Sequence, residues 1–314
     1  MRITFKHILM SALLSAFTSG CIKEDLSECN PGVLLKFDYS LNSEFTNLFG
    51  KEVGKVTVYV FDENGFYYDT FSEEGNHLTN NWKMRLPLPP GNYTTVTWGG
   101  NLGSYRLGET NADRTSFQDE LKKGVTHIDD FMLMAEKDGQ PLTRLDDLYH
   151  GMVRVTSVYQ PEAVTTVDLI KDTHHLIVTV QDAAVTEERG NAPYEAYCTG
   201  ANARYMADNN VGKLAETVVY RPFDTYTNQG EAVSELNLLR LEIGRPFRLV
   251  VKRKDGKTVF DKDLVEALLA TGHYKTQEDL DREITFRVVI KVDKDAGIVV
   301  IINGWEVVEI IPGL

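Results

Sequence analysis

The sequence predicts an all-β protein, built as two antiparallel β-sandwich domains with few short helices. Short runs of β-branched and aromatic residues recur along the chain, turn signals separate them, and only brief segments have helical spacing. We expect a signal segment at residues 1–20, a first domain at residues 21–165 and a second at residues 166–314. No exact repeat or low-complexity linker marks the boundary.

Residues 1–20 have the pattern of a bacterial lipoprotein signal that ends at Cys21. A short cationic start precedes the mostly apolar run Ile8–Phe17, which is too short to span a membrane as a helix. Small residues then lead into the cysteine, although Thr18 stands where an aliphatic residue is usual. An ordinary secretory signal is the alternative. Acyl chains on Cys21 would anchor the chain to the membrane without spanning it.

The composition limits the partners. The formal net charge is −13, and the signal segment contributes only basic residues, so the mature chain is more acidic still. Such a surface argues against nucleic acid as a partner. The acidic stretch 22–28 beside Cys21 resembles the signal that sends lipoproteins of Bacteroidota to the outer face of the cell. Cys29 and Cys198 could pair or remain thiols.

The first half of the mature chain predicts a hairpin and two further strands. Val56–Phe61 is β-branched and aromatic, Asp62–Gly65 is a turn, and Phe66–Phe71 returns. Met84–Leu88 is a strand that runs into prolines, and Asn92–Trp98 resumes after them.

One short helix is expected at 116–121. Ser116 and Asp119 have capping-box spacing, and Gly124 suits a helix end. Strand candidates follow at Phe131–Met134 and Met152–Val155.

A second block of strands begins near Thr166. It includes a short amphipathic helix at Asp263–Ala270. The predicted strands are Val167–Ile170, Leu176–Val180, Phe247–Val251, Thr258–Phe260, Ile284–Ile290 and Ile298–Ile302.

The run Ile298–Ile302 has two interpretations because it is apolar on both faces. It is either a central strand of its own domain or a strand that completes a neighbour's sheet. In the second case, this run and the following Trp305–Ile311 would contact a partner through Ile298, Val300, Ile302, Trp305, Val307 and Ile310.

No catalytic or metal-binding constellation stands out. The sequence lacks the nucleophile-elbow, zincin, P-loop and dinucleotide-binding motifs, so we expect no enzymatic activity, metal or cofactor. His174 and His175 are neighbours on a predicted strand and should point to opposite faces. A surface glycan-binding lipoprotein that uses Trp82, Trp98 or tyrosine-rich loops is the alternative function.

Several segments, taken in order, resemble the FimB-type fimbrial anchor family of Bacteroidales, the lipoproteins that seat type V pili. The segments that carry the resemblance are Cys21, Asp25-Leu26, Cys29-Asn30-Pro31, Val58–Asp62, Leu88–Tyr93, Trp98, Leu249–Val251, Asp261–Leu269 and Gly304-Trp305.

The resemblance implies two transthyretin-like β-sandwich domains and a non-enzymatic anchor. Such an anchor is held at the outer membrane by lipid, palmitate included, on Cys21. Its partner is a fimbrial stalk pilin, and it limits fibre length. Polymerising pilins of this class are cut after an arginine in the N-terminal domain. This chain has none from Ile3 to Met84, which favours an anchor over a stalk pilin.

Overall fold

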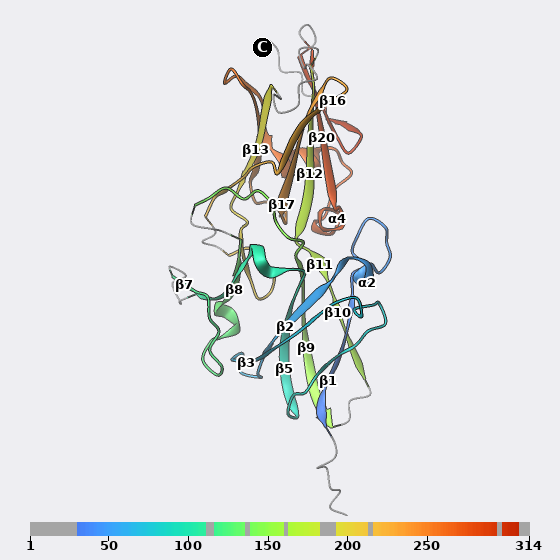
Figure 1. Cartoon of the computed structure of the whole chain (residues 1–314), viewed down its shortest axis with the longest axis vertical. Coiled ribbons are helices and arrows are strands. Elements are labelled where there is room, and N and C mark those ends of the chain that lie inside the picture. Colours follow the sequence, from blue (N-terminus) through green and yellow to red (C-terminus); the bar gives the residue numbers. More distant parts are fainter. Residues whose placement is uncertain are drawn as a thin grey trace, which may run out of the picture.

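The structure is a computed structural model that describes residues 30–110, 116–135, 139–159, 163–182, 193–212, 216–293 and 297–307. Strands dominate these residues and the helices are short, so the predicted all-β class is confirmed. Figure 1 shows an elongated molecule with the first strands at one end of the long axis and the last strands at the other. We call these two ends the N-terminal part and the C-terminal part.

An eight-stranded sheet forms the N-terminal part. Six strands follow the order β10-β1-β9-β5-β2-β3, with β11 paired to β9 and β4 paired to β1. Their bounds are β1 Pro31–Asp38, β2 Lys55–Phe61, β3 Tyr67–Glu74, β4 Met84–Leu86, β5 Gly91–Gly99, β9 Tyr149–Tyr159, β10 Val164–Asp168 and β11 Ile170–Lys171.

The predicted hairpin is confirmed as β2 and β3. Gly65 has a φ of 84°, a left-handed conformation that a glycine adopts without strain. The Asp62 carboxylate accepts hydrogen bonds from the backbone N–H of Asn64 and of Phe66, both at 2.9 Å, which closes the turn.

β2 is buried on both faces because it lies between two layers of the fold. Val56, Val58 and Val60 belong to a core that β1 covers. Tyr59 and Phe61 point the other way, into a second core that continues into the C-terminal part. The larger core therefore joins the two parts of the molecule.

A small sheet in the order β14-β8-β6-β7 bridges the two parts. Its strands are β6 Arg106–Thr110, β7 Phe117–Gln118, β8 Phe131–Met134 and β14 Arg204–Met206. The predicted helix at 116–121 is wrong, because β7 pairs with β6 through Thr110 and Phe117. Phe117 packs against Met132, Met134 and Met206, and tertiary packing thereby overrides the local capping signal.

Two sheets enclose the core of the C-terminal part. The six-stranded sheet has the order β16-β17-β12-β20-β21-β22, with β12 Thr173–Gln181, β16 Asp224–Asn228, β17 Glu231–Leu239, β20 Thr285–Asp293, β21 Gly297–Ile302 and β22 Trp305–Val307. The four-stranded sheet has the order β15-β13-β18-β19, with β13 Tyr194–Gly200, β15 Val218–Tyr220, β18 Phe247–Arg253 and β19 Thr258–Asp263.

Short helices fill the remaining connections. The predicted helix near 263–270 is confirmed as α3, in which Asp263 caps the first turn and Leu264, Val265 and Leu268 are buried. The helix after it is capped by Thr276 and Asp279 in a capping box. The bounds are α2 Phe49–Glu52, η2 Leu102–Ser104, η3 Ile128–Asp130, α3 Leu264–Ala270 and α4 Gln277–Arg282.

Two strand pairs are parallel, whereas the sequence predicted antiparallel sandwiches. β1 pairs with β10, and β12 pairs with β20, each across a long stretch of chain. A parallel pair needs a long crossover instead of a tight turn, so no local signal in the sequence announces it.

Candidate partner-binding edge and the buried joint

β21 is an integral strand of its own sheet. It pairs with β20 over six residues and with β22 on its other side. Ile298, Val300 and Ile302 are buried in the larger core. In this conformation these three side chains are covered, as the interpretation as a central strand requires.

Among the described residues, β22 is the last strand on its side of that sheet. Trp305 lies opposite Ile302 and is 50% exposed. Its ring stacks on His273, with the centroids 5.0 Å apart and the planes at 25°. An edge strand offers unpaired backbone groups to a partner strand, and a half-exposed tryptophan offers a large contact area.

A tight turn holds β22 in place. Asn303 and Gly304 have φ values of 47° and 87°, as a two-residue hairpin of the Asn-Gly kind requires. The Asn303 side chain accepts a hydrogen bond from the Arg287 N–H at 2.6 Å and donates one to the Tyr274 hydroxyl at 2.6 Å. The turn is thus fixed both to β20 and to the loop before α4.

An aromatic cleft lies beside this edge. Its volume is about 450 Å³, and Phe45, His273 and Arg282 are among its lining residues. Phe45 is 74% exposed and has a φ of 54°, an uncommon conformation for a bulky residue. The Arg282 guanidinium lies 4.5 Å from the centroid of its ring. His273 therefore connects the Trp305 edge to a second exposed aromatic residue.

The remaining predicted contact residues are less fully defined. The backbone of Val307 pairs with Val300. Ile310 and Cys21 lie outside the described residues, as does Cys29. Cys198 is buried in β13, and burial raises the pKa of its thiol.

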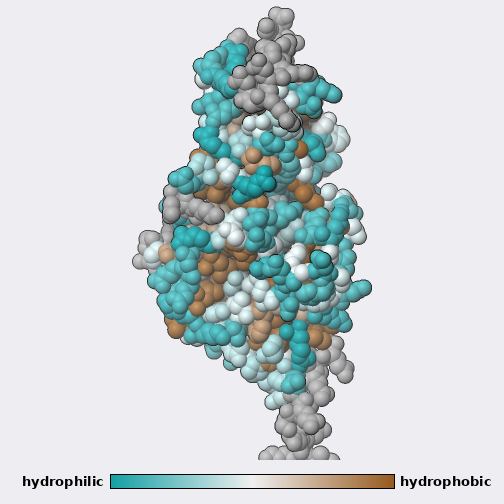
Figure 2. Space-filling model, in the orientation of Figure 1, coloured by the Kyte–Doolittle hydropathy of each residue, from teal (hydrophilic) through white to brown (hydrophobic). Residues whose placement is uncertain are grey.

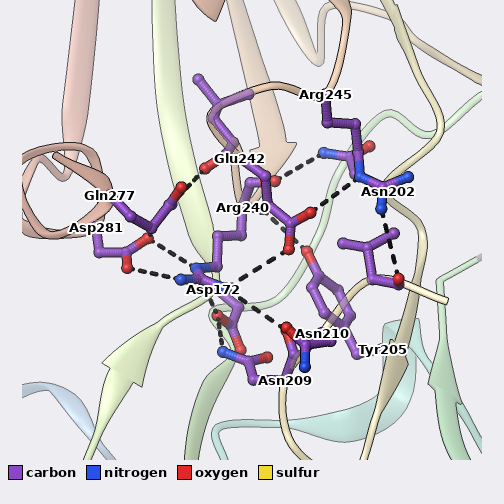
Figure 3. A network of polar contacts seen from close by, with 12 residues as sticks. Asp172, Asn202, Tyr205, Asn209, Asn210, Arg240, Glu242, Arg245, Gln277 and Asp281 are labelled. Carbon is purple, nitrogen blue, oxygen red and sulfur yellow. Dashed lines mark hydrogen bonds and ion pairs between the residues drawn. The ribbon is translucent and has the colours of Figure 1, made fainter. Parts of the chain in front are cut away.

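A buried polar network, which we call the joint, surrounds Asp172 where the chain passes from β11 to β12 (Figure 3). The Arg240 guanidinium donates to both carboxylate oxygens of Asp281 in α4, each at 2.7 Å. Asp172, between β11 and β12, accepts a hydrogen bond from the Asn209 amide at 2.9 Å and lies 3.9 Å from Arg240. Sequence reasoning missed this network, because its members come from four separate segments.

Burial shifts the protonation equilibria of groups around this joint. Burial raises the pKa of the Asp172 carboxyl from 3.8 to about 7, although Arg240 lowers it in part. Burial lowers the pKa of His150 and of His174 from 6.5 to about 4. The Nδ1–H of His174 lies 2.7 Å from the Glu283 carbonyl oxygen, which accepts its hydrogen bond. These histidines are structural and neutral at pH 7.

Residues 26–311 match the model of the family of fimbrillin-A associated anchor proteins Mfa1 and Mfa2. The chain belongs to this fimbrial anchor family. It is similar to the minor fimbrium anchoring subunit Mfa2 of Porphyromonas gingivalis, with 25% identity over 263 residues that cover 80% of this chain and 76% of the relative. The family is one of fimbria-associated structural proteins and is not an enzyme family, which places the chain among cell-surface fimbrial components.

Solved structures of fimbrial and adhesin-like proteins share the fold. A candidate polysaccharide-binding protein of Bacteroides thetaiotaomicron has a TM-score of 0.75 and 28% identity, and the match covers 88% of this chain and 97% of that one. A candidate adhesin of the same organism has a TM-score of 0.75 and 27% identity, covering 90% and 99%. The fimbrial anchor protein Mfa2 of P. gingivalis has a TM-score of 0.66 at 22% identity, covering 88% and 98%.

Other features of this fimbrial anchor family member bear on the alternative function. Trp98 is fully buried, so it cannot serve as a glycan platform. Trp82 packs in a stack with Phe37 and Phe49.

Among the described residues, no helix is long and apolar enough to cross a membrane, and no cluster of ligating side chains could hold a metal ion.

Proposed function

We propose that this chain is the non-enzymatic anchor subunit that tethers a fimbria to the outer membrane and limits its length. The observation that carries the proposal is the edge strand β22, with its half-exposed Trp305, on a chain whose family model spans residues 26–311. The partner is a fimbrial stalk pilin, and the contact is a strand of the pilin added to β22.

The tether in this proposal is lipid on Cys21. Three acyl chains would hold the protein firmly in the outer membrane, exposed at the cell surface. β1 begins at the end of the molecule opposite the C-terminal part (Figure 1). A chain held at residue 21 would therefore present its C-terminal part away from the membrane.

At the other end, β22 would accept the partner while β21 supports it from within. Main-chain hydrogen bonds along β22 supply affinity, and Trp305 and Val307 select the partner's side chains. Ile298, Val300 and Ile302 hold the edge in position through the core. Ile310 would extend the contact beyond the described residues.

A division into two domains fits this arrangement. β10 and β11 pair with strands of the N-terminal part, and β12 opens the C-terminal sheet. We infer a boundary between Lys171 and Thr173, a few residues after the one expected at 165/166.

A surface glycan-binding lipoprotein is the second candidate, because a similar structure is that of a candidate polysaccharide-binding protein. The burial of Trp98 removes one of its proposed platforms. The exposed Trp305 and Phe45 remain available to a sugar ring. A glycan array probed with the purified chain separates the two proposals. A glycan-binding protein should bind specific glycans on the array, whereas a pilin anchor should bind none.

Truncation after Gly304 tests the pilin contact. It removes β22 and keeps the buried β21, whereas deletion of residues 298–314 would also open the core. The truncated chain should still be exported and folded but should no longer recover a pilin from solubilised envelopes in an affinity pull-down. Recovery of the pilin at the full-length level would contradict the proposal.

A further inference from the structure

The segment that connects the two parts of the molecule, residues 169–172, is hydrogen-bonded to the N-terminal part at several points. The Leu169 N–H donates to the Asp38 carbonyl at 2.7 Å, and β11 pairs with β9. The Asp172 N–H donates to the Leu148 carbonyl at 2.7 Å, and its carboxylate enters the Arg240 network. Tension applied to the C-terminal part thus reaches β10 without a slack linker.

The parallel pairing of β1 and β10 sets how that tension acts. Leu34 lies opposite Val164, and the pairing continues in register to Asp38 opposite Asp168. In a parallel pair, the start of one strand and the end of the other lie at opposite ends of the ladder. Figure 1 shows β1 entering at the lower end of the molecule and β12 leaving toward the upper end.

A pull from these two ends therefore runs along the strands and loads every hydrogen bond of the ladder together. A pull across a hairpin would instead open its bonds one after another. Sliding is also opposed by the core, because Leu35 and Phe37 of β1 and Val167 of β10 are buried. A shift by one residue would turn these side chains to the wrong face.

The C-terminal part contains a second parallel ladder. β12 and β20 are parallel over seven residue pairs, from His175 opposite Thr285 to Gln181 opposite Lys291. β12 leads directly from the joint, so it receives the same tension at its first residue.

We propose that the parallel β1–β10 ladder is a mechanical clamp that keeps the N-terminal part folded when the two ends of the molecule are pulled apart. The biological source of that pull rests on the anchor function proposed above. The clamp itself is a property of the isolated protein and can be measured without membrane or pilin.

The test is single-molecule force spectroscopy on the full chain, with handles at both ends. Lys36 and Thr166 are register partners with side chains on the outer face. K36C/T166C would therefore staple β1 to β10 with a disulfide that mass spectrometry can verify. The matched control is T57C/S72C in the antiparallel β2–β3 hairpin, where the two hydroxyls lie 3.0 Å apart.

Opening of the N-terminal part should release about 450 Å of chain, at up to ~3.6 Å per residue. Oxidised K36C/T166C should lose this event, because the disulfide carries the load past residues 37–165, and reductant should restore it. This result assigns the event to the N-terminal part. Oxidised T57C/S72C should keep the same rupture force with a release shorter by about 50 Å. The clamp is refuted if stapling β2 to β3 raises the rupture force, because the load would then be borne by that hairpin. Neither result would bear on whether the chain binds a pilin.

Discussion

The ring of Trp305 lies nearly flat on the ring of His273, with the centroids 5.0 Å apart. This contact fixes a half-exposed tryptophan on the outermost strand of the C-terminal sheet. A pre-positioned aromatic side chain loses little freedom on binding, so it can contribute strongly to an interface.

Trp305→Ala should weaken binding of the stalk pilin by about 30-fold or more, as loss of a tryptophan hot spot does. The melting temperature should change little, because half of the side chain is exposed. Titration of purified pilin against the two proteins measures the effect. Trp305→Tyr keeps a ring on His273 and should retain most of the affinity. Equal affinity of the alanine variant would exclude this edge as the contact.

Arg240→Met should lower the free energy of unfolding by about 3–5 kcal/mol, because it leaves the buried Asp281 carboxylate without its ion-pair partner. Arg248→Met is the matched control, since Arg248 pairs with Asp261 at an exposed position. That variant should cost far less, because solvent screens an exposed ion pair. Urea denaturation compares the two, and equal losses would mean that the joint is no stronger than a surface pair.

Much of the fold could be predicted from the sequence, because its strands are marked locally. The Asn64-Gly65 turn marks the β2–β3 hairpin, and Asp263 marks the start of α3. The segment 116–121 misled because Phe117 finds a methionine cluster that is distant in sequence. Trp305 opens a second strand-like run and does lie in a strand, β22, whereas its role as a contact residue stays a prediction.

The joint and the parallel ladders could not be predicted in the same way. Asp172 and Arg240 carry no shared motif, and only the folded chain brings them within 3.9 Å. Pairing of β1 with β10 depends likewise on contacts between segments far apart in sequence.

His174 should make the protein less stable as the medium becomes acidic. Its pKa falls from 6.5 to about 4 on burial, so the unfolded chain binds a proton in this range and the folded chain does not. The contribution is complete above pH 6.5 and is lost as the pH falls toward 4, by up to about 3 kcal/mol. His174→Gln should flatten this part of the stability profile.

Asp172 acts in the opposite direction. Its pKa is raised to about 7, so its contribution grows as the pH falls below 7. The native protein and the His174→Gln variant both keep Asp172. The change in urea midpoint between pH 7 and pH 4.5 is measured for each protein, and the difference between the two changes reports on His174 alone. Parallel profiles for the two proteins would show that His174 does not titrate differently on folding.

Ile302→Ala should cost about 2–5 kcal/mol of stability, because a fully buried side chain leaves a cavity. Ile301→Ala, on the half-buried face of the same strand, should cost less. Denaturant unfolding of both variants measures the difference. A mild effect at Ile302 would indicate that β21 is not integral to its own sheet and is free to be donated.

The central claim is that lipid on Cys21 holds a fimbria to the cell. The most direct measurement is electron microscopy and fractionation of cells that carry Cys21→Ser in place of the native chain, with Cys29→Ser as the control. We predict that cells with Cys21→Ser shed fibres into the medium and that the variant protein is absent from the outer-membrane fraction. In cells with Cys29→Ser, the fibres should stay attached and the protein should stay in that fraction. Fibres of normal length that remain attached in the Cys21→Ser cells would contradict the account.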